Sequence, residues 1–240
     1  MTSVRVDRPG TGLRSALCAA AVLLVVTLAG CGRVADVAVD PAPVVAGPVS
    51  GEATATSTPG STPGSTATDP VARLRAGLLS PADLGGAWTS GQPPVPDATT
   101  PAPCGGPSTV ARFPDALRVG STVVGPAGAV VQEALSVYAD ADTARAAFGA
   151  GAVGLGCGRG TLHGAVVAIG APQDLRPDVG GDQASAWKVD SETIDAVLVL
   201  VQARQAVFAF AYVTPPGSAP AARPDPRALT RTAVSRALAA

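Results

Sequence analysis

Histidine and lysine each occur once in this chain, as His163 and Lys188, and aromatic residues make up only 3% of it. With a formal net charge of −1, the chain offers no basic surface of the kind that binds nucleic acid. The sequence also lacks the G-x-S-x-G, H-E-x-x-H and Walker A motifs of serine hydrolases, zinc peptidases and P-loop enzymes. We therefore expect no enzyme activity, no cofactor and no nucleic-acid partner.

The longest apolar run near the start of the chain is too short to span a bilayer, which takes about 20 residues. This run, residues 16–30, contains no charged residue and follows Arg5, Arg8 and Arg14. A positive segment, a short apolar core and small residues form the pattern of a secretory signal peptide. We expect residues 1–30 to be such a signal peptide, with a buried helix as the alternative.

The run ends in Leu28-Ala29-Gly30-Cys31, which resembles the lipobox of bacterial lipoproteins. The resemblance implies cleavage before Cys31 and attachment of diacylglycerol to its sulfur. Each buried CH₂ contributes about 0.8 kcal/mol, so two or more acyl chains give stable anchoring. We therefore expect a lipoprotein held by lipid on the extracellular side of the cell membrane. The high share of alanine, glycine and proline suggests an actinobacterial source.

Residues 31–69 have the composition of a disordered linker. They include the segment STPGSTPGSTATDP, which repeats Ser-Thr-Pro-Gly and has no large apolar side chain. Such a segment cannot bury enough surface to offset the entropy of ordering. As a flexible coil it would reach roughly 35 Å. The folded domain is expected in residues 70–240, a length that suits one domain.

Two of the four cysteines are expected in the folded domain. Cys18 lies in the expected signal peptide and Cys31 is the expected lipidation site, which leaves Cys104 and Cys157. In an exported protein these two are expected to form a disulfide. Together with His163 they do not complete a four-ligand zinc site, so no metal is expected.

Hydrophobic periodicity predicts an α+β fold, with an antiparallel sheet of about five strands and helices packed mainly on one face. Helices are predicted to begin at Asp69-Pro70, at Ser80-Pro81, at Asp140 or Asp142, and at Asp225-Pro226. Residues 89–108 are predicted to form a loop. Strands are predicted at 131–138, 161–169, 184–189, 194–201 and 206–213. The nearly continuous apolar run 194–201 is typical of a buried central strand, and its short connection to 206–213 predicts a hairpin.

Several residues are of types that act in catalysis or in ligand binding, and each also has a simpler structural interpretation. As a general base His163 would need an oriented carboxylate and a nucleophile, and an exposed strand histidine is the favoured reading. The glycine cluster 154–160 follows a predicted helix, whereas a phosphate loop precedes one. The aspartates of 174–182 lack EF-hand spacing. Tyr138, Trp187 and Tyr212 are candidates for lining a ligand site, with anchoring of the core as the alternative.

Four segments, in order, resemble the PknH-like extracellular sensor domain family. They are LLSPADLGGAW (78–88), YADADTARAAF (138–148), GGDQASAW (180–187) and VLVLVQARQAVFAFAYV (197–213). That family includes the outer domain of an actinobacterial receptor kinase and many stand-alone lipoproteins. The resemblance implies a curved antiparallel sheet packed on helices, with a cleft for an unidentified ligand. Kinase-linked members generally have two disulfides, whereas Cys104 and Cys157 supply only one.

The sequence as a whole predicts a surface lipoprotein whose domain binds an unidentified ligand or envelope protein. Its partners would be the membrane, through the lipid on Cys31, and that ligand. One alternative is a cell-envelope hydrolase that uses His163. The other is a structural envelope protein without a small ligand.

Overall fold

The computed structural model describes residues 69–218 and 223–239. The expected signal peptide, Cys31 and most of the expected linker lie outside these residues. The helices are α1 (Pro70–Ala76), α2 (Pro81–Leu84), α3 (Thr109–Arg112), α4 (Ala141–Val153), α5 (Arg176–Val179) and α6 (Pro226–Ala239), with a 3₁₀ turn η1 (Pro126–Gly128). The strands are β1 (Thr89–Ser90), β2 (Leu117–Val124), β3 (Val130–Val137), β4 (Arg159–Leu162), β5 (Ala165–Ile169), β6 (Gln173–Asp174), β7 (Gln183–Asp190), β8 (Asp195–Ala203) and β9 (Ala206–Thr214).

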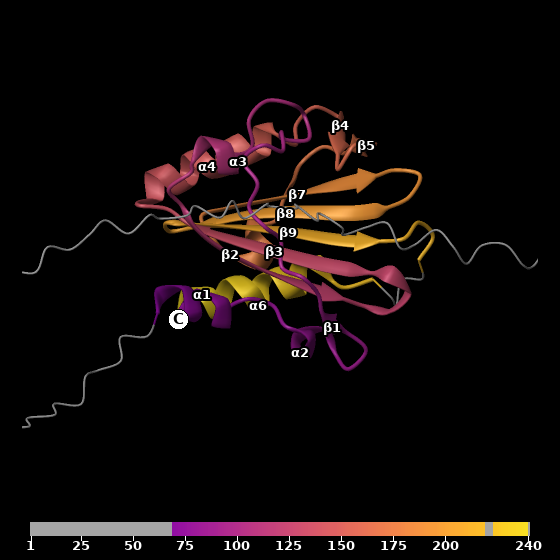
Figure 1. The fold of residues 1–240 in the computed structure, drawn as a ribbon, viewed down its shortest axis with the longest axis horizontal. Helices are drawn as coiled ribbons and strands as arrows, with labels where there is room; N and C mark the ends of the chain where they lie inside the picture. Colours follow the sequence, from indigo (N-terminus) through magenta and orange to yellow (C-terminus); the bar gives the residue numbers. More distant parts are fainter. Residues whose placement is uncertain (1–68, 219–222, 240) are drawn as a thin grey trace, which may run out of the picture. The chain divides into compact units, whose positions relative to one another are not determined.

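The strands form one antiparallel sheet (Figure 1). Their order across it is β1-β2-β3-β9-β8-β7-β5-β4, and β6 pairs with β7 outside this path. The predicted hairpin is confirmed, because β8 pairs with β9 along its whole length up to Ala203 and Ala206. Strand β3 then pairs with β9 from Val130–Val213 to Val137–Ala206. The centre of the sheet is therefore formed by β3, β9 and β8.

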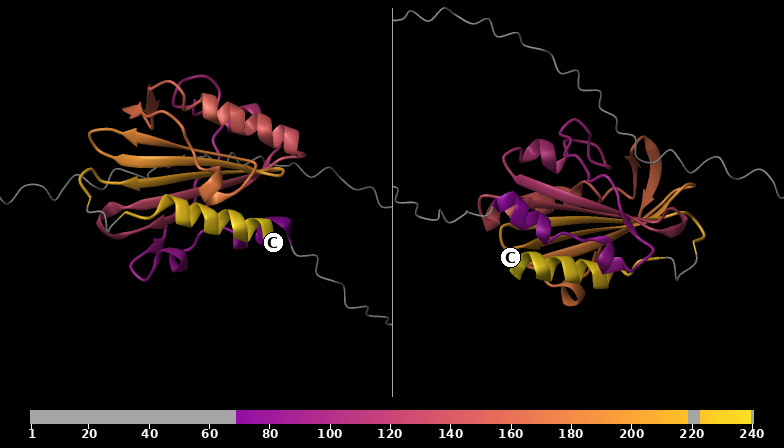
Figure 2. Two further views of the ribbon diagram at one scale, coloured as in Figure 1. Left: turned by 180° about the vertical axis from the view of Figure 1, so that it is seen from behind. Right: turned by 60° about the horizontal axis from the view of Figure 1, so that its bottom comes forward.

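Helices cover both faces of the sheet, whereas the sequence predicted them mainly on one. Helices α3 and α4 lie on one side, and α1, α2 and α6 lie on the other (Figures 1 and 2). The apolar run in β8 explains this arrangement. Val199 and Val201 face α6 and are fully buried, while Leu198 and Leu200 pack on the opposite side. A strand that is apolar on both faces has to be covered on both.

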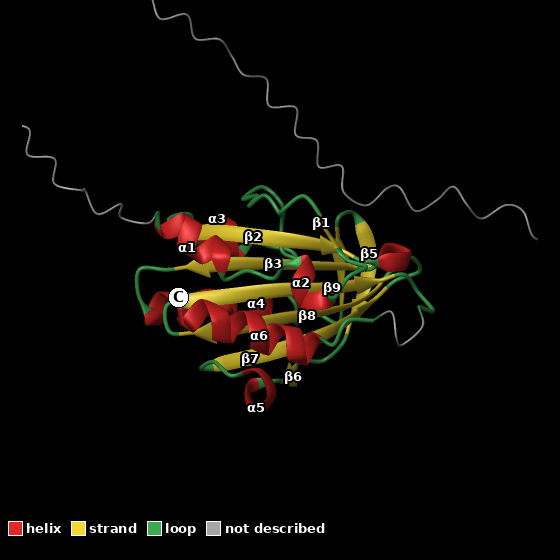
Figure 3. Cartoon of the chain, turned by 90° about the horizontal axis from the view of Figure 1, so that it is seen from below, coloured by secondary structure: helices red, strands yellow, loops and turns green. Residues whose placement is uncertain are grey.

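Helix α6 lies across one face of the sheet (Figure 3). This face carries the larger core. On β9 the rings of Phe208, Phe210 and Tyr212 form a ladder with centroids 6.4 and 6.0 Å apart. Ala233 and Val234 of α6 pack into the same core. The small side chains of α6 let the helix lie close to these rings, so the aromatic residues on this face fill the layer between helix and sheet.

The opposite face carries two smaller cores. Helix α4 packs Ala144, Ala147 and Phe148 against Tyr138. Trp187 of β7 lies in a separate cluster, whose buried members are Leu155, Val167, Ile169, Trp187, Val189 and Ala196. Tyr212, Trp187 and Tyr138 thus lie in three different cores.

The sheet has nine strands rather than the five predicted, for three physical reasons. Strand β2 was missed because Gly120 and the short polar residues beside it interrupt its apolar alternation. Residues 161–169 were predicted as one strand, but His163 and Gly164 turn the chain between β4 and β5. Both have positive φ, 48° and 82°, as a two-residue hairpin turn requires. The strands β1 and β6, with two residues each, are too short to show a period.

The predicted helix starts agree with the structure. The carboxylate of Asp69 accepts a hydrogen bond from Val71 N at 3.0 Å, and that of Asp140 accepts from Thr143 N at 2.6 Å. Asp140 is therefore the cap of α4. At α2 the carboxylate of Asp83 accepts from Ser80 N at 2.8 Å. Among the helices of residues 69–218 and 223–239, none is long and apolar enough to cross a membrane.

Candidate functional site

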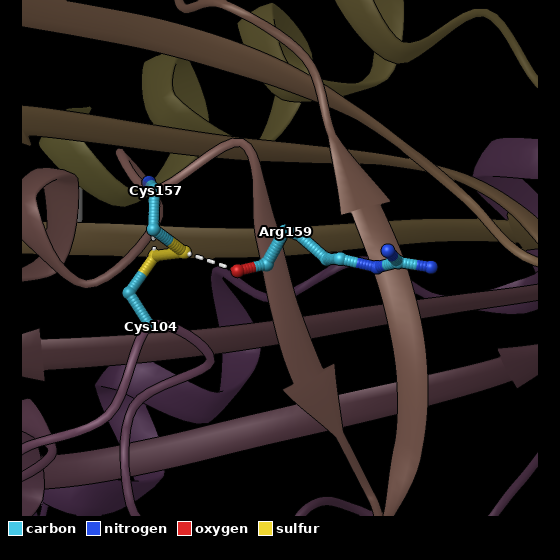
Figure 4. The surroundings of a disulfide bond; sticks show 3 residues. All are labelled: Cys104, Cys157 and Arg159. Atoms are coloured by element: carbon cyan, nitrogen blue, oxygen red, sulfur yellow. Dashed lines mark hydrogen bonds between the residues drawn. A yellow bond between two sulfur atoms is a disulfide. The ribbon is translucent and has the colours of Figure 1, made fainter.

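The structure contains the predicted disulfide between Cys104 and Cys157 (Figure 4). It joins the loop before α3 to the segment after α4, with the two Cα atoms 5.6 Å apart. The same loop is held by backbone hydrogen bonds from Cys104 N to Gly154 O and from Thr161 N to Pro103 O, at 3.0 and 2.8 Å. Figure 4 also shows the sulfur of Cys157 near Arg159 O, at 2.9 Å. The bridge therefore fastens the loop beside β4, at one edge of the sheet.

The three aromatic candidates do not gather in one site. Tyr138, Trp187 and Tyr212 are 7%, 1% and 3% exposed, and each belongs to a different core. Tyr212 lies on the α6 face, where its hydroxyl is 2.8 Å from the Thr230 hydroxyl. Trp187 is enclosed on the opposite face, and its Nε1 finds no hydrogen-bond partner among the described residues. Tyr138 lies beside a hollow.

That hollow encloses about 210 Å³ at the start of α4. Its floor is formed by the rings of Phe113 and Tyr138, which meet edge to face with centroids 5.7 Å apart. The guanidinium of Arg118 donates to the carbonyls of Phe113, Pro114 and Ala116, which holds the loop that forms one wall. Burial raises the pKa of the Tyr138 hydroxyl, so it stays neutral at physiological pH.

The rim of this hollow is polar, since Arg112, Asp115 and Thr143 line it. An aromatic floor with charges of both signs at the rim suits a ligand that has a flat or apolar part and polar groups around it. The volume is below the roughly 300–1,000 Å³ of most small-molecule sites. It would therefore hold one ring or one side chain of a larger ligand.

A second, more polar hollow lies between the β4–β5 hairpin and the turn from β7 to β8. It encloses about 460 Å³ and is lined by Arg159, Ala165, Val166, Val167, Asp190, Ser191, Glu192 and Thr193. It exists because β5 pairs with β7 only at Ala168 and Ile169. His163 lies at the exposed tip of the same hairpin, in the turn and not in a strand as predicted.

The most unusual polar group is Glu133, which is 1% exposed in the middle of β3. It lies on the α6 face, opposite Phe210 on β9 and Ser121 on β2. Its Oε2 accepts a hydrogen bond from Leu79 N at 2.6 Å, and its Oε1 has no partner among the described residues. Burial raises the pKa of Glu133 to about 7, and the Leu79 N–H and the charge of Arg236 offset only part of that effect.

An ion pair next to Glu133 joins α6 to α2. The guanidinium of Arg236 donates to both carboxylate oxygens of Asp83 and to Leu78 O. We call this set of contacts the Arg236 clamp. It lowers the pKa of Asp83 to about 2, chiefly through the hydrogen bonds from Arg236. The clamp and Glu133 hold the same short connector, Leu78–Ser80, from two sides.

Glu133 was not among the residues selected from the sequence, although a signal for it exists. Val131, Leu135 and Val137 share its parity in the strand, so a carboxylate stands on the apolar side of β3. That mismatch indicates a buried acid whenever the apolar side of the strand faces a core.

Cys31, the predicted lipidation site, lies outside the described residues. No group of three potential metal ligands occurs within residues 69–218 and 223–239.

The fold is similar to that in the crystal structure of the extracellular domain of PknH from Mycobacterium tuberculosis. The TM-score is 0.50 at 14% sequence identity, and the match covers 71% of this chain and 97% of that chain. At this identity the likeness shows a shared fold only. No protein-family model matches the sequence, and no curated protein matches it.

Proposed function

We propose that this chain is an exported lipoprotein, anchored through Cys31, whose folded domain acts as a sensor-like binding module outside the cell membrane. The observation that carries the proposal is the likeness in fold to an extracellular domain. The disulfide supports it, because disulfides persist in oxidising, exported compartments. The ligand is an envelope component or an envelope protein.

Within this proposal, the hollow at Tyr138 receives part of the ligand. It combines an aromatic floor with polar groups, and it includes one of the residues that the sequence selected. The exposed His163 turn supports the hydrolase alternative poorly. Within the described residues, no hydrogen bond joins the His163 imidazole to a carboxylate or to a nucleophile, which a catalytic base would need.

The anchor is tested by mass spectrometry of the N-terminal peptide of the protein isolated from its native membrane. We expect the peptide to begin at Cys31 and to carry acyl chains. A matched Cys31→Ser variant should leave the membrane fraction. A wild-type chain that starts elsewhere and carries no acyl group would contradict the anchoring.

The binding module is tested by native mass spectrometry of protein purified from its own envelope. We expect a bound mass on the wild type that is lost in Thr143→Arg, because the new side chain fills the hollow. Ala146→Arg places the same side chain on an exposed position of α4 outside the lining, so it should keep the bound mass. Equal retention of the bound mass in both variants would remove the hollow from the proposal.

The hydrolase alternative is tested with His163→Ala, which should not change the rate of any turnover. If the wild type hydrolyses an envelope substrate and this variant does not, the hydrolase alternative replaces the binding module.

A further inference from the structure

The first segment of the domain is attached to the sheet by few polar contacts, and Glu133 makes one of them. We call Pro70–Leu84 the N-terminal arm; it comprises α1, the connector 77–80 and α2. Leu78 and Leu79 are buried against the sheet, 6% and 3% exposed. The connector is held by the bond from Leu79 N to Glu133 and by the Arg236 clamp. The arm thus closes directly over a buried acid.

We propose that Glu133 is a proton-operated latch, whose neutral form keeps the N-terminal arm closed on the sheet and whose ionised form releases it. This goes beyond the proposed binding function, because it uses neither the hollow at Tyr138 nor the lipid anchor. The opening of the arm thereby responds to the pH of the surrounding solution.

The surroundings of Glu133 favour its neutral form. The groups that face it are Arg236 on α6, Asp83 on α2, Tyr212 on β9 and the hydroxyl of Ser121 on β2. Arg236, the single cation of the set, is already bound to Asp83. The hydroxyl of Tyr212 is neutral, because burial raises its pKa. An ionised Glu133 would have the N–H of Leu79 and at most the hydroxyl of Ser121 for its two oxygens, and these donors offset only part of the cost of burying a charge.

The geometry also determines which part moves. Strand β3 lies inside the sheet and is paired over eight residues with β2 on one side and with β9 on the other. Glu133 therefore cannot reach water by moving with its own strand. The arm lies on the outside of this face, and lifting its connector gives water access to both carboxylate oxygens. Relief of the buried charge and opening of the arm are thus the same movement.

Protonation restores the closed form. The carbonyl oxygen of the neutral acid can still accept from Leu79 N, and its O–H supplies a donor on the side where Ser121 stands. The hydroxyl of Ser121 has no partner among the described residues, so a neutral Glu133 offers a way to satisfy both groups. The closed arm is then held by the neutral acid, by the Arg236 clamp and by the apolar contacts of Leu78 and Leu79.

Hydrogen exchange followed by mass spectrometry tests the latch on the whole chain with its disulfide intact. After correction for intrinsic exchange, protection of peptides within residues 70–88 should fall about tenfold between pH 6 and pH 8, the factor expected if the opened acid recovers its ordinary pKa of 4.5. Peptides from the β8–β9 hairpin exchange only when the whole domain unfolds, so they should stay more strongly protected than the arm at every pH. Glu133→Gln should abolish the pH dependence of the arm.

Two further variants separate the latch from other causes. His163→Gln removes the single imidazole of the chain and should behave as the wild type. Asp83→Asn breaks the clamp, so it should lower protection of the arm at every pH. It also removes a negative charge near Glu133 and frees Arg236, so the fall in protection with pH should be smaller than tenfold. An arm whose protection does not change with pH overturns the proposal. Equal protection of the arm and the hairpin at every pH also overturns it, because the arm would then open only when the whole domain unfolds. If Glu133→Gln does not fold, the wild-type profiles of arm and hairpin still decide. Loss of the bound mass in Thr143→Arg bears on the binding function and leaves this result untouched.

Discussion

Replacing Glu133 by glutamine should change how the stability of the whole domain depends on pH. In the native state Glu133 holds its proton up to about pH 7, whereas in the unfolded chain it releases that proton near its ordinary pKa of 4.5. Between these values the folded protein binds more protons than the unfolded one. The free energy of unfolding of the wild type therefore falls as the pH rises through this range, and it levels off above it.

The size of this effect follows from the two pKa values. At 1.36 kcal/mol for each pKa unit, burying the ionised form costs about 3 kcal/mol, and about 2.5 kcal/mol of that cost appears between pH 5 and pH 8. Glutamine keeps the shape and a carbonyl that can accept from Leu79 N, but it has no proton to lose. We expect Glu133→Gln to be markedly more stable than the wild type at pH 8 and close to it at pH 5.

The assay is urea unfolding followed by fluorescence, with free energies extrapolated to water at several pH values from 5 to 8. The slope against pH decides the question, because any packing defect of the amide shifts the whole curve by a constant amount. His163→Gln serves as the control and should keep the wild-type slope. If wild type and Glu133→Gln lose stability in parallel as the pH rises, the reasoning from the buried carboxyl is refuted.

Three other perturbations follow from the same structure. Arg236→Ala breaks the clamp and should lower the free energy of unfolding by about 2 kcal/mol, measured at pH 5.5, because its charged hydrogen bonds are lost; no change in the urea midpoint would contradict the clamp. The double variant Cys104→Ala and Cys157→Ala opens a loop with a sequence separation of 53 residues and should cost about 4 kcal/mol by the chain-entropy argument, seen in urea unfolding. Gly160→Ala should destabilise by about 1–3 kcal/mol, since its Cβ would come within 2.4 Å of a backbone carbonyl. Gly86→Ala has open space and should cost far less, so equal losses in thermal unfolding of the two variants would disprove the close approach.

Much of the local structure could be read from the sequence, because its signals act between neighbouring residues. Asp69 and Asp140 cap their helices as their side chains and positions predict. The apolar run of β8 identified the centre of the sheet, and the expectation of export together with two cysteines in the domain predicted the disulfide. The turn at His163 and Gly164 was missed, since a turn of only two residues interrupts a strand pattern too briefly to be recognised.

Tertiary packing determined two features that no local sequence pattern encodes: the face of the sheet on which each aromatic side chain lies, and the burial of Glu133. It placed Tyr212 and Trp187 on opposite faces of the sheet, because strand register determines the face on which each side chain lies. The apolar parity of β3 predicts that Glu133 points toward a core, but only the arm that closes over it removes its water and raises its pKa. The sequence by itself thus determined the longer helices, their caps and the strands β3, β7, β8 and β9. The meeting of β3, the N-terminal arm and α6, which are distant in the chain, produced the buried acid.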